Sequence, residues 1–174
     1  MKFAPDIRKT HVESLLGPLV LAATDLGLAG LWFDDQKHQP AWKDWPERDD
    51  DPLLQQAAGQ LQAYFDGTRT QFELPLDLRG GTLFQLSVWQ ALLHIPYGVC
   101  TTYGTLSGAL NRPTAVRAVG TAVGRNPLGI IVPCHRVLGA DGSLTGYAAG
   151  LGRKAALLAL ESGTRPDSEL ELTA

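Results

Sequence analysis

Ile130-Ile131-Val132-Pro133-Cys134-His135-Arg136-Val137 is the stretch from which the rest of the chain can be interpreted. Its β-branched apolar residues are typical of a buried strand, and Pro133 cannot continue the hydrogen-bond ladder of such a strand. We therefore expect the chain to turn at the proline and to place Cys134 where the strand ends. There the thiol lies beside an imidazole and a guanidinium, the side chains that best favour a thiolate. The stretch predicts that Cys134 is a nucleophile.

Two other interpretations compete for Cys134. A zinc site needs four ligands at a workable spacing, and one adjacent histidine with one other cysteine, Cys100, does not supply them. A buried structural cysteine is the ordinary state of a free thiol, and that alternative stays open. The basic neighbours and the turn favour the nucleophile over it.

Length and composition predict a globular protein with a real core. The chain has 174 residues, of which 44% are hydrophobic, enough for one large domain or two small ones. No apolar run is long enough to cross a bilayer, and the first residues form no apolar signal segment. A cytoplasmic location without membrane contact is therefore expected, with both cysteines as free thiols.

The net charge of −3 is unevenly distributed. Residues 1–79 carry −5, residues 80–163 carry +4 and residues 164–174 carry −2. The positive segment contains Cys134, so a polyanionic ligand would be attracted to that part. We expect an N-terminal domain over 1–79, a C-terminal domain over 80–163 and a flexible tail over 164–174.

The first domain reads as a small sheet with a helix on it. Two apolar segments, 20–24 and 28–33, flank a short turn and predict a hairpin. Pro52 opens an amphipathic helix that ends at Phe65. A further short strand is expected over 71–74, and no pattern in this half indicates chemistry.

The second domain reads as mainly helical. Helices are expected over residues 83–94, 103–110, 113–125 and 151–162. The second and third of these are joined by a short turn and have the dimensions of a helix-turn-helix. A hairpin turn over 139–143 follows, so the arrangement predicted is a winged helix.

The helix expected over 113–125 has two distinct faces. Its valines, at a spacing of three and four residues, can pack on the preceding helix. The opposite face carries small and basic residues: Thr114, Arg117, Gly120, Thr121, Gly124 and Arg125. A glycine inside a helix costs about 1 kcal/mol relative to alanine. Close approach of a DNA groove and tight helix packing are both open as reasons for the two glycines.

Glu161 is the candidate partner of His135. It shares an apolar face with Leu157 and Leu158 near the end of the last helix. A carboxylate there opposes the helix dipole and would be partly desolvated unless paired. Pairing would fix the imidazole tautomer and let His135 take the proton of Cys134, directly or through a water. An ordinary exposed glutamate is the alternative.

Four motifs together resemble the O6-methylguanine-DNA methyltransferase family. They are Pro133-Cys134-His135-Arg136-Val137, Arg117-Ala118-Val119-Gly120, Asn126-Pro127 and Gly146-Tyr147-Ala148. The resemblance covers residues 84–161, and the first half matches that family's ribonuclease-H-like N-terminal domain only in size and character. It implies an α+β fold, with a small sheet-plus-helix domain before a winged helix-turn-helix-like domain.

The resemblance implies direct reversal of DNA damage. O6-alkylguanine would be flipped out of double-stranded DNA and its alkyl group moved irreversibly to Cys134, once per molecule. O4-methylthymine stays open as a second lesion. No cofactor is implied, and because residues 1–79 contain no cysteine, no structural zinc is expected. We expect the protein to act as a monomer, and cooperative binding to DNA is an open alternative.

The resemblance also implies roles for individual residues. Tyr103 would help to rotate the nucleotide and protonate the leaving guanine, and Arg117 would fill the gap in the base stack. The residues expected to orient and deprotonate the thiol are Asn126, His135 and Glu161. The residues expected to contact DNA are Thr114, Arg117, Ala118, Gly120, Thr121, Arg125 and Arg136. The pocket wall is expected from Val137, Tyr147 and Ala148, the last of which has no hydroxyl to offer O6.

Two other functions remain as alternatives. Alkyltransferase-like proteins bind damaged DNA without repairing it and lack the acceptor cysteine, so the presence of Cys134 counts against that function. A cysteine hydrolase would use the same nucleophile but would release an acyl product in repeated turnovers.

Overall fold

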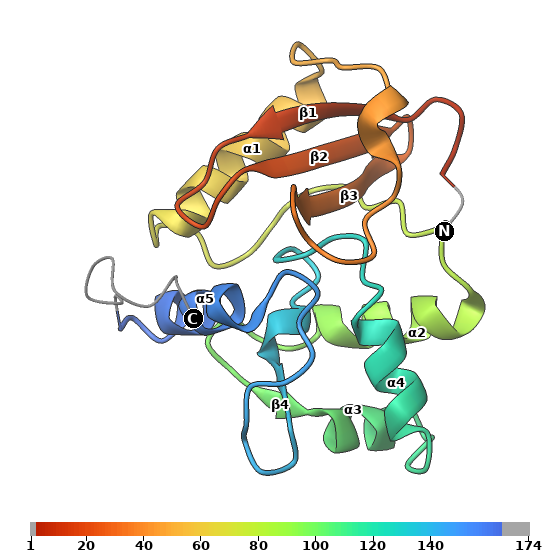
Figure 1. Ribbon diagram of the computed structural model, residues 1–174, viewed down its shortest axis with the longest axis vertical. Helices are drawn as coiled ribbons and strands as arrows, with labels where there is room; N and C mark the ends of the chain where they lie inside the picture. The colour runs from red at the N-terminus through yellow and green to blue at the C-terminus, as the bar shows by residue number, and fades with distance from the viewer. Residues whose placement is uncertain (1–2, 165–174) are drawn as a thin grey trace.

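The computed structural model describes residues 3–164 and has two halves, a sheet with one helix and a group of short helices (Figure 1). The predicted mixed fold is confirmed. The tail predicted to be flexible lies, from residue 165 onward, outside the described residues. Within 3–164, no helix is both long enough and apolar enough to cross a membrane.

The sheet half contains three antiparallel strands in the order β1-β2-β3. The hairpin predicted from the sequence is confirmed as β2 (Leu19–Thr24) and β3 (Gly27–Phe33), which are buried along their whole length. The edge strand β1 (Arg8–Val12) was not predicted. Its sequence, Arg-Lys-Thr-His-Val, is mostly polar, and its partners are supplied by β2 and by the loop at Pro46.

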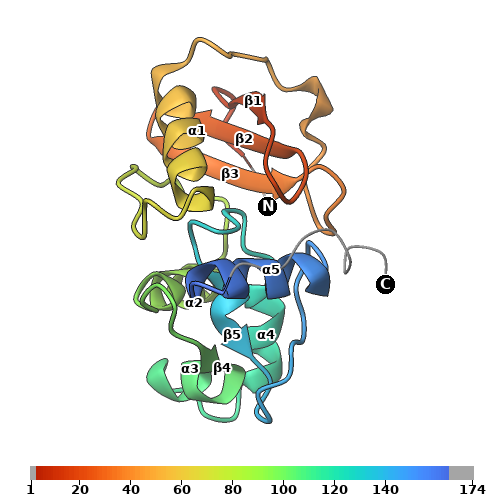
Figure 2. The same ribbon diagram turned by 90° about the vertical axis from the view of Figure 1, so that its left-hand side faces the viewer.

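Helix α1 (Pro52–Phe65) covers one face of this sheet, as predicted (Figure 2). Asp51 caps it by accepting hydrogen bonds from the next backbone N–H groups, and Pro52 takes the first position, where no N–H is needed. The strand predicted over 71–74 does not form. The backbone of Glu73 is satisfied by the side-chain amide of Gln60 instead of a neighbouring strand.

The helical half contains α2 (Leu83–Leu93), α3 (Tyr103–Ala109), α4 (Val116–Val123) and α5 (Leu151–Glu161). Thr82 and Thr102 cap α2 and α3, which begin at the residues that the sequence predicts, and at Thr82 the capping box is complete. Helix α4 begins later than predicted. Pro113 and Thr114 lie in the preceding turn, where the Ala115 N–H already bonds to the carbonyl of Arg112.

The apolar run over 130–132 is buried as expected but is not a strand. It forms a turn in which Ile130 has a φ of 68°. The carbonyl of Val132 accepts a hydrogen bond from the side chain of Asn126, so no neighbouring strand is needed. The next residues form a short 3-10 helix, η2 (Cys134–Arg136). A second such helix, η1 (Trp42–Asp44), lies in the loop before α1.

The strand β5 (Val137–Leu138) follows η2 and pairs in parallel with β4 (Thr101–Thr102). The turn predicted over 139–143 is present, closed by a bond from the Gly139 N–H to the Ser143 carbonyl. No strand within residues 3–164 pairs with β5 in a hairpin, so the wing is a loop over 139–150.

The two halves share one core and several backbone contacts. The buried side chains of β3 and α1 belong to the same apolar cluster as those of α2, α4 and the 128–132 turn. Leu31 in β3 accepts a hydrogen bond from Gly129 and donates one to Pro127. Both views place α5 on the side of the helical half that faces the sheet half, with α3 on the far side (Figures 1 and 2). The turn that carries Cys134 is therefore held against the sheet half.

Candidate active site

Cys134 begins η2 and lines a small pocket, with 8% of its surface exposed. The pocket is lined by Gln36, Val123, Gly124, Asn126, Gly129, Cys134, Gly146, Tyr147, Ala148 and Ala149. The other cysteine, Cys100, is exposed and lies outside this pocket. Of the two cysteines, Cys134 is therefore the one that lines this pocket.

Asn126 holds both the thiol and the turn that carries it. Its side-chain N–H group donates to Cys134 Sγ at 3.2 Å and to the Val132 carbonyl at 2.7 Å. Its side-chain oxygen accepts from the Leu128 N–H at 3.0 Å. Burial raises the pKa of the Cys134 thiol, and the hydrogen bond from Asn126 and the positive charge of Lys154 only partly oppose this. The resting sulfur is a neutral thiol, so its reaction needs a base.

His135 and Glu161 form the pair predicted from the sequence. His135 Nε2 lies 2.8 Å from Glu161 Oε1, and both side chains are completely buried. An ionised carboxylate can only accept, so Nε2 carries the hydrogen and Nδ1 is left as an acceptor. Nδ1 is buried and has no hydrogen-bond partner among the described residues. Burial lowers the pKa of His135 below its ordinary value, which keeps the ring neutral.

Glu161 accepts hydrogen bonds from four residues. Arg136 donates to both carboxylate oxygens, at 2.8 Å each. The Gly98 N–H donates to Oε2 at 3.1 Å, and the Tyr64 hydroxyl donates to Oε1 at 2.7 Å. Burial alone would raise the pKa of Glu161, but the bonds from His135 and Arg136 hold it well below its usual range. The carboxylate is therefore ionised throughout the neutral range.

Arg136, which the sequence predicts to contact DNA, lies inside the protein. Only 8% of its side chain is exposed, and its guanidinium is bonded to Glu161 and to the carbonyl of Ile95. The single 3-10 turn of η2 directs the side chain of Arg136 into the protein, where it forms an ion pair with the buried carboxylate of Glu161. Its positive charge balances the negative charge of Glu161 inside the protein.

Lys154 and Tyr64 are buried site residues that the sequence interpretation missed. Lys154 on α5 donates from Nζ to the carbonyls of Val137, at 2.5 Å, and Thr145, at 2.6 Å. Those bonds tie β5 to the wing loop, and the charge favours a thiolate at Cys134. The sequence held a signal for Lys154, since it lies on the apolar face of α5 with Leu157. For Tyr64, the sequence held no signal beyond its position on the apolar face of α1.

Tyr103 connects α3, α4 and the wing loop. Its hydroxyl lies 3.3 Å from the carbonyls of both Thr145 and Gly146. Burial raises the pKa of Tyr103, so the phenol keeps its proton and can donate it. A Cβ added to Gly120 would meet the Tyr103 ring at 3.7 Å, an ordinary contact. Tight packing against Tyr103 therefore does not explain the glycine in α4.

Except for Arg136, the residues predicted to contact DNA lie on α4 or in the turns just before and after it. Thr114, Arg117, Ala118, Thr121 and Arg125 are all exposed, and Gly120 is partly so. Within residues 3–164, neither Arg117 nor Arg125 has an acidic partner. The exposed face of α4 is a solvated positive surface at the outer side of the helical half.

The pocket wall combines residues from both halves. Tyr147 and Ala148 line the pocket and are half-buried, whereas Val137 is buried in β5 and is not among the lining residues. The Ala148 carbonyl accepts a hydrogen bond from the Lys37 N–H at 3.0 Å, and Gln36 reaches the pocket from the same loop after β3. The sequence interpretation placed no pocket residue in the first half.

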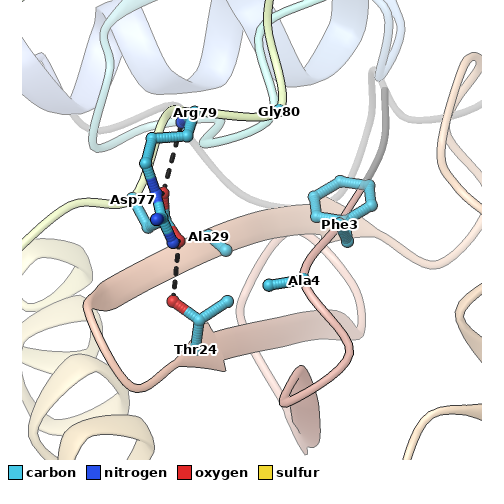
Figure 3. Close-up of a pocket in the computed structure, with 7 residues that line it drawn as sticks. All are labelled: Phe3, Ala4, Thr24, Ala29, Asp77, Arg79 and Gly80. Atoms are coloured by element: carbon cyan, nitrogen blue, oxygen red, sulfur yellow. Dashed lines mark hydrogen bonds and ion pairs between the residues drawn. The ribbon is translucent and has the colours of Figure 1, made fainter.

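A second, more open pocket lies on the sheet half, away from Cys134 (Figure 3). Its polar side chains already satisfy one another. Asp77 accepts two bonds from the guanidinium of Arg79 and one from the hydroxyl of Thr24. These bonds, above all those from the Arg79 side chain, lower the pKa of Asp77 to about 2. In the part of the chain that the structure describes, no group of His, Cys, Asp and Glu could hold a metal ion.

Known proteins that resemble this chain cover both halves. Residues 83–163 match the family described as 6-O-methylguanine DNA methyltransferase, DNA binding domain, and residues 7–78 match its ribonuclease-like domain. A methylated-DNA–protein-cysteine methyltransferase of Mycobacterium bovis is 48% identical over 155 residues, which are 89% of this chain and 92% of the relative. One of Methanosarcina barkeri is 48% identical over 153 residues, 86% of this chain and 94% of the relative.

Solved structures agree with these relatives. The crystal structure of Mycobacterium tuberculosis OGT in complex with DNA is 46% identical with a TM-score of 0.81, covering 92% of this chain and 95% of that one. The Mycobacterium tuberculosis O6-methylguanine methyltransferase is 46% identical with a TM-score of 0.82, covering 93% and 96%.

Proposed function

This chain belongs to the 6-O-methylguanine DNA methyltransferase family, and from that premise we propose that Cys134 is the residue that accepts the alkyl group. The protein binds DNA and repairs it by transferring an alkyl group to a cysteine of its own. The observation that carries the choice of Cys134 is its place in the pocket, beside the buried pair of His135 and Glu161. Cys100 is exposed and has no comparable base beside it.

The lesion proposed is O6-alkylguanine in double-stranded DNA. The sulfur of Cys134, a pocket-lining residue that is only 8% exposed, is out of reach of a base within the stack. The nucleotide must therefore rotate out of the duplex, as it does wherever an enzyme acts on a base edge. The face of α4 would track the backbone, where contacts carry little sequence information, and Arg117 would occupy the vacated place in the stack.

Proton transfer comes first in the proposed mechanism. His135 accepts the thiol proton of Cys134 at Nδ1, through a water, because the other ring nitrogen is occupied by Glu161. The ionised carboxylate stabilises the imidazolium that results, while Asn126 donates a hydrogen bond to the sulfur. The charge of Lys154 also favours the thiolate.

Alkyl transfer then follows as a displacement at an sp3 carbon. The S–C bond forms, the C–O6 bond breaks and its electron pair goes to the guanine. Tyr103 donates its proton to the leaving guanine and recovers one from the imidazolium through solvent. The net change is a thiol and an alkylguanine converted into a thioether and a guanine, and no other reactant is consumed.

The product makes the reaction a single event for each protein molecule. A thioether has no acidic proton and is a poor leaving group, and no group near Cys134 can regenerate the thiol. We propose further that the protein acts as a monomer in the cytoplasm, where a thiol acceptor stays reduced. We retain the division into domains over 1–79 and 80–163 as part of the same proposal.

Reaction with a methylated duplex tests the proposal. The protein is expected to gain one methyl group, and peptide mapping is expected to find it on Cys134. Cys134→Ser should be inert and Cys100→Ser should react normally. Methyl on Cys100, or activity in Cys134→Ser, would refute the assignment. More than one equivalent of product for each active protein would instead favour a hydrolase.

A further inference from the structure

One donor to the Glu161 carboxylate comes from the other half of the chain. Tyr64 lies on α1, 97 residues before Glu161, and its hydroxyl donates to Oε1 at 2.7 Å between two buried residues. From this contact we propose that Tyr64 is a positioning residue for alkyl transfer, which acts through Glu161 on the imidazole of His135. The inference rests on the proposed role of His135 as the base.

The donors compete for one oxygen atom. Oε1 of Glu161 accepts from Tyr64, His135 and Arg136, whereas Oε2 accepts from Arg136 and Gly98. A carboxylate has about four lone-pair sites on its two oxygens, and here it receives bonds from five N–H and O–H groups. The Tyr64 bond therefore reduces the negative charge that Oε1 offers to the imidazole.

Tyr64 is held rigidly in the position that this role requires. Its ring lies against Phe65 and Phe72, with centroids 5.5 Å away in each case, and against Tyr97 at 6.1 Å. Burial and the charge of Glu161 raise the pKa of Tyr64, so the hydroxyl stays protonated and remains a donor. The sheet half thus supplies a fixed hydrogen-bond donor to the site.

Other titratable and charged groups also face the His135–Glu161 pair. They are Tyr97 after α2, Cys134 and Arg136 in η2, Tyr147 in the wing loop and Lys154 in α5. Arg136 and Lys154 disfavour the imidazolium form of His135, and Glu161 favours it. Tyr64→Phe leaves all of these groups in place, so a change in pH dependence would arise from the oxygen that lost its donor.

Removing the hydroxyl should move the acid limb of the rate profile to higher pH. Without Tyr64, Oε1 of Glu161 interacts more strongly with the Nε2–H of His135 and stabilises the imidazolium. The ring is then protonated at a higher pH and cannot accept the thiol proton. Because a positioned base contributes large rate factors, we expect transfer to fall about three- to tenfold below the limb. Above the limb, the variant should approach the wild-type rate.

The experiment compares Tyr64→Phe with Tyr97→Phe over a range of pH, using a methylated duplex under single-turnover conditions. Tyr97 belongs to the same aromatic cluster, but among residues 3–164 the hydrogen-bond partner of its hydroxyl is the Leu160 carbonyl, at 3.4 Å, and not Glu161. Only Tyr64→Phe should shift the limb. An unshifted limb in Tyr64→Phe, or an equal shift in Tyr97→Phe, would overturn the inference.

A second variant keeps the hydroxyl and should shift the acid limb in the opposite direction. Replacing Tyr64 by 3-fluorotyrosine makes the phenol a stronger donor, so the limb should move to lower pH. The titration of the 15N-labelled His135 ring should move in the same direction as the limb in each variant, without any turnover. An unmoved ring titration in both Tyr64 variants would also overturn the inference. If Cys134→Ser transfers alkyl groups, the proposed function fails; if it is inert and both Tyr64 variants match the wild type, only the role of Tyr64 fails.

Discussion

Arg117 and Arg136 place the same guanidinium group in opposite surroundings. Arg117 lies on the exposed face of α4 without an acidic partner among residues 3–164, and Arg136 lies in η2 with its charge held by buried Glu161. A solvated charge adds little to stability and remains available to a polyanion. A buried charge is committed to its partner, and breaking the pair destabilises the fold.

This comparison separates recognition from chemistry. The α4 face can lose a side chain without strain in the core, so its variants should affect the encounter with DNA alone. The network around Glu161 joins η2, α5, the loop after α2 and α1, so its variants should affect folding and reactivity together.

Glu161→Gln should have the largest effect. The neutral amide leaves Arg136 without a counter-charge in the interior, and breaking a buried pair typically costs about 3–5 kcal/mol in the free energy of unfolding. Alkyl transfer should also fall about a hundredfold or more, because His135 loses its charged partner. Denaturant unfolding and single-turnover rates measure the two effects. Glu73→Gln, at an exposed position, is the control, and a Glu161→Gln protein as stable as that control would contradict the prediction.

Acidification should weaken the same network in two stages. The pKa of His135 is lower in the folded protein than its ordinary value of 6.5, so stability should begin to fall as the pH drops below that value. The pKa of Glu161 is also lowered, from 4.5, so a further loss should begin below that value. Melting temperatures from pH 8 to pH 3 test this. Arg117→Ala should show the same curve as the wild type, and a wild-type protein that gains stability on acidification would exclude this account.

Alkylation of Cys134 should destabilise the protein. The added methyl group must fit a pocket packed around a thiol, and overpacking typically costs about 1–3 kcal/mol. The melting temperature of the fully reacted protein should therefore lie below that of the unreacted protein. Blocking exposed Cys100 with a small alkylating reagent in Cys134→Ser is the control, and it should leave the melting temperature unchanged. Equal melting temperatures before and after repair would refute the strain argument.

Arg117→Ala should give the smallest and most selective effect. Repair of a methylated duplex should slow about tenfold, because unstacking costs a few kcal/mol and its compensation is lost. Reaction with free O6-benzylguanine and the melting temperature should not change. Arg48→Ala removes an exposed arginine from the sheet half and serves as the control for net charge. Equal losses with the duplex and the free base would instead place Arg117 in the chemistry.

Local rules predicted most of the elements correctly. The caps at Thr82 and Thr102 satisfy backbone groups of the very next turn, so the sequence alone places the starts of those helices. The β2–β3 hairpin is specified by a short turn between two apolar segments. The pairing of His135 with Glu161 was also accessible, because a carboxylate on the apolar face of a helix requires a partner.

Two strands predicted from the sequence do not form, because backbone groups in those segments bond to a side chain and not to a neighbouring strand. The run over 130–132 has the composition of a buried strand and is buried, but the side chain of Asn126 takes the place of a neighbouring strand. The segment over 71–74 is satisfied by Gln60 in the same way. Composition indicates that a segment is buried, and only the packed structure decides which group completes its hydrogen bonds.

The sequence by itself determined that a thiol, an imidazole and a guanidinium meet at one turn beside a basic helical segment. The tertiary structure alone decided that Arg136 points inward, that Lys154 crosses to the wing loop and that Tyr64 reaches Glu161 from the sheet half. These contacts join segments far apart in the chain. Their partners are selected by the low dielectric of the shared interior, where a buried charge must be matched by whichever donor the fold brings near.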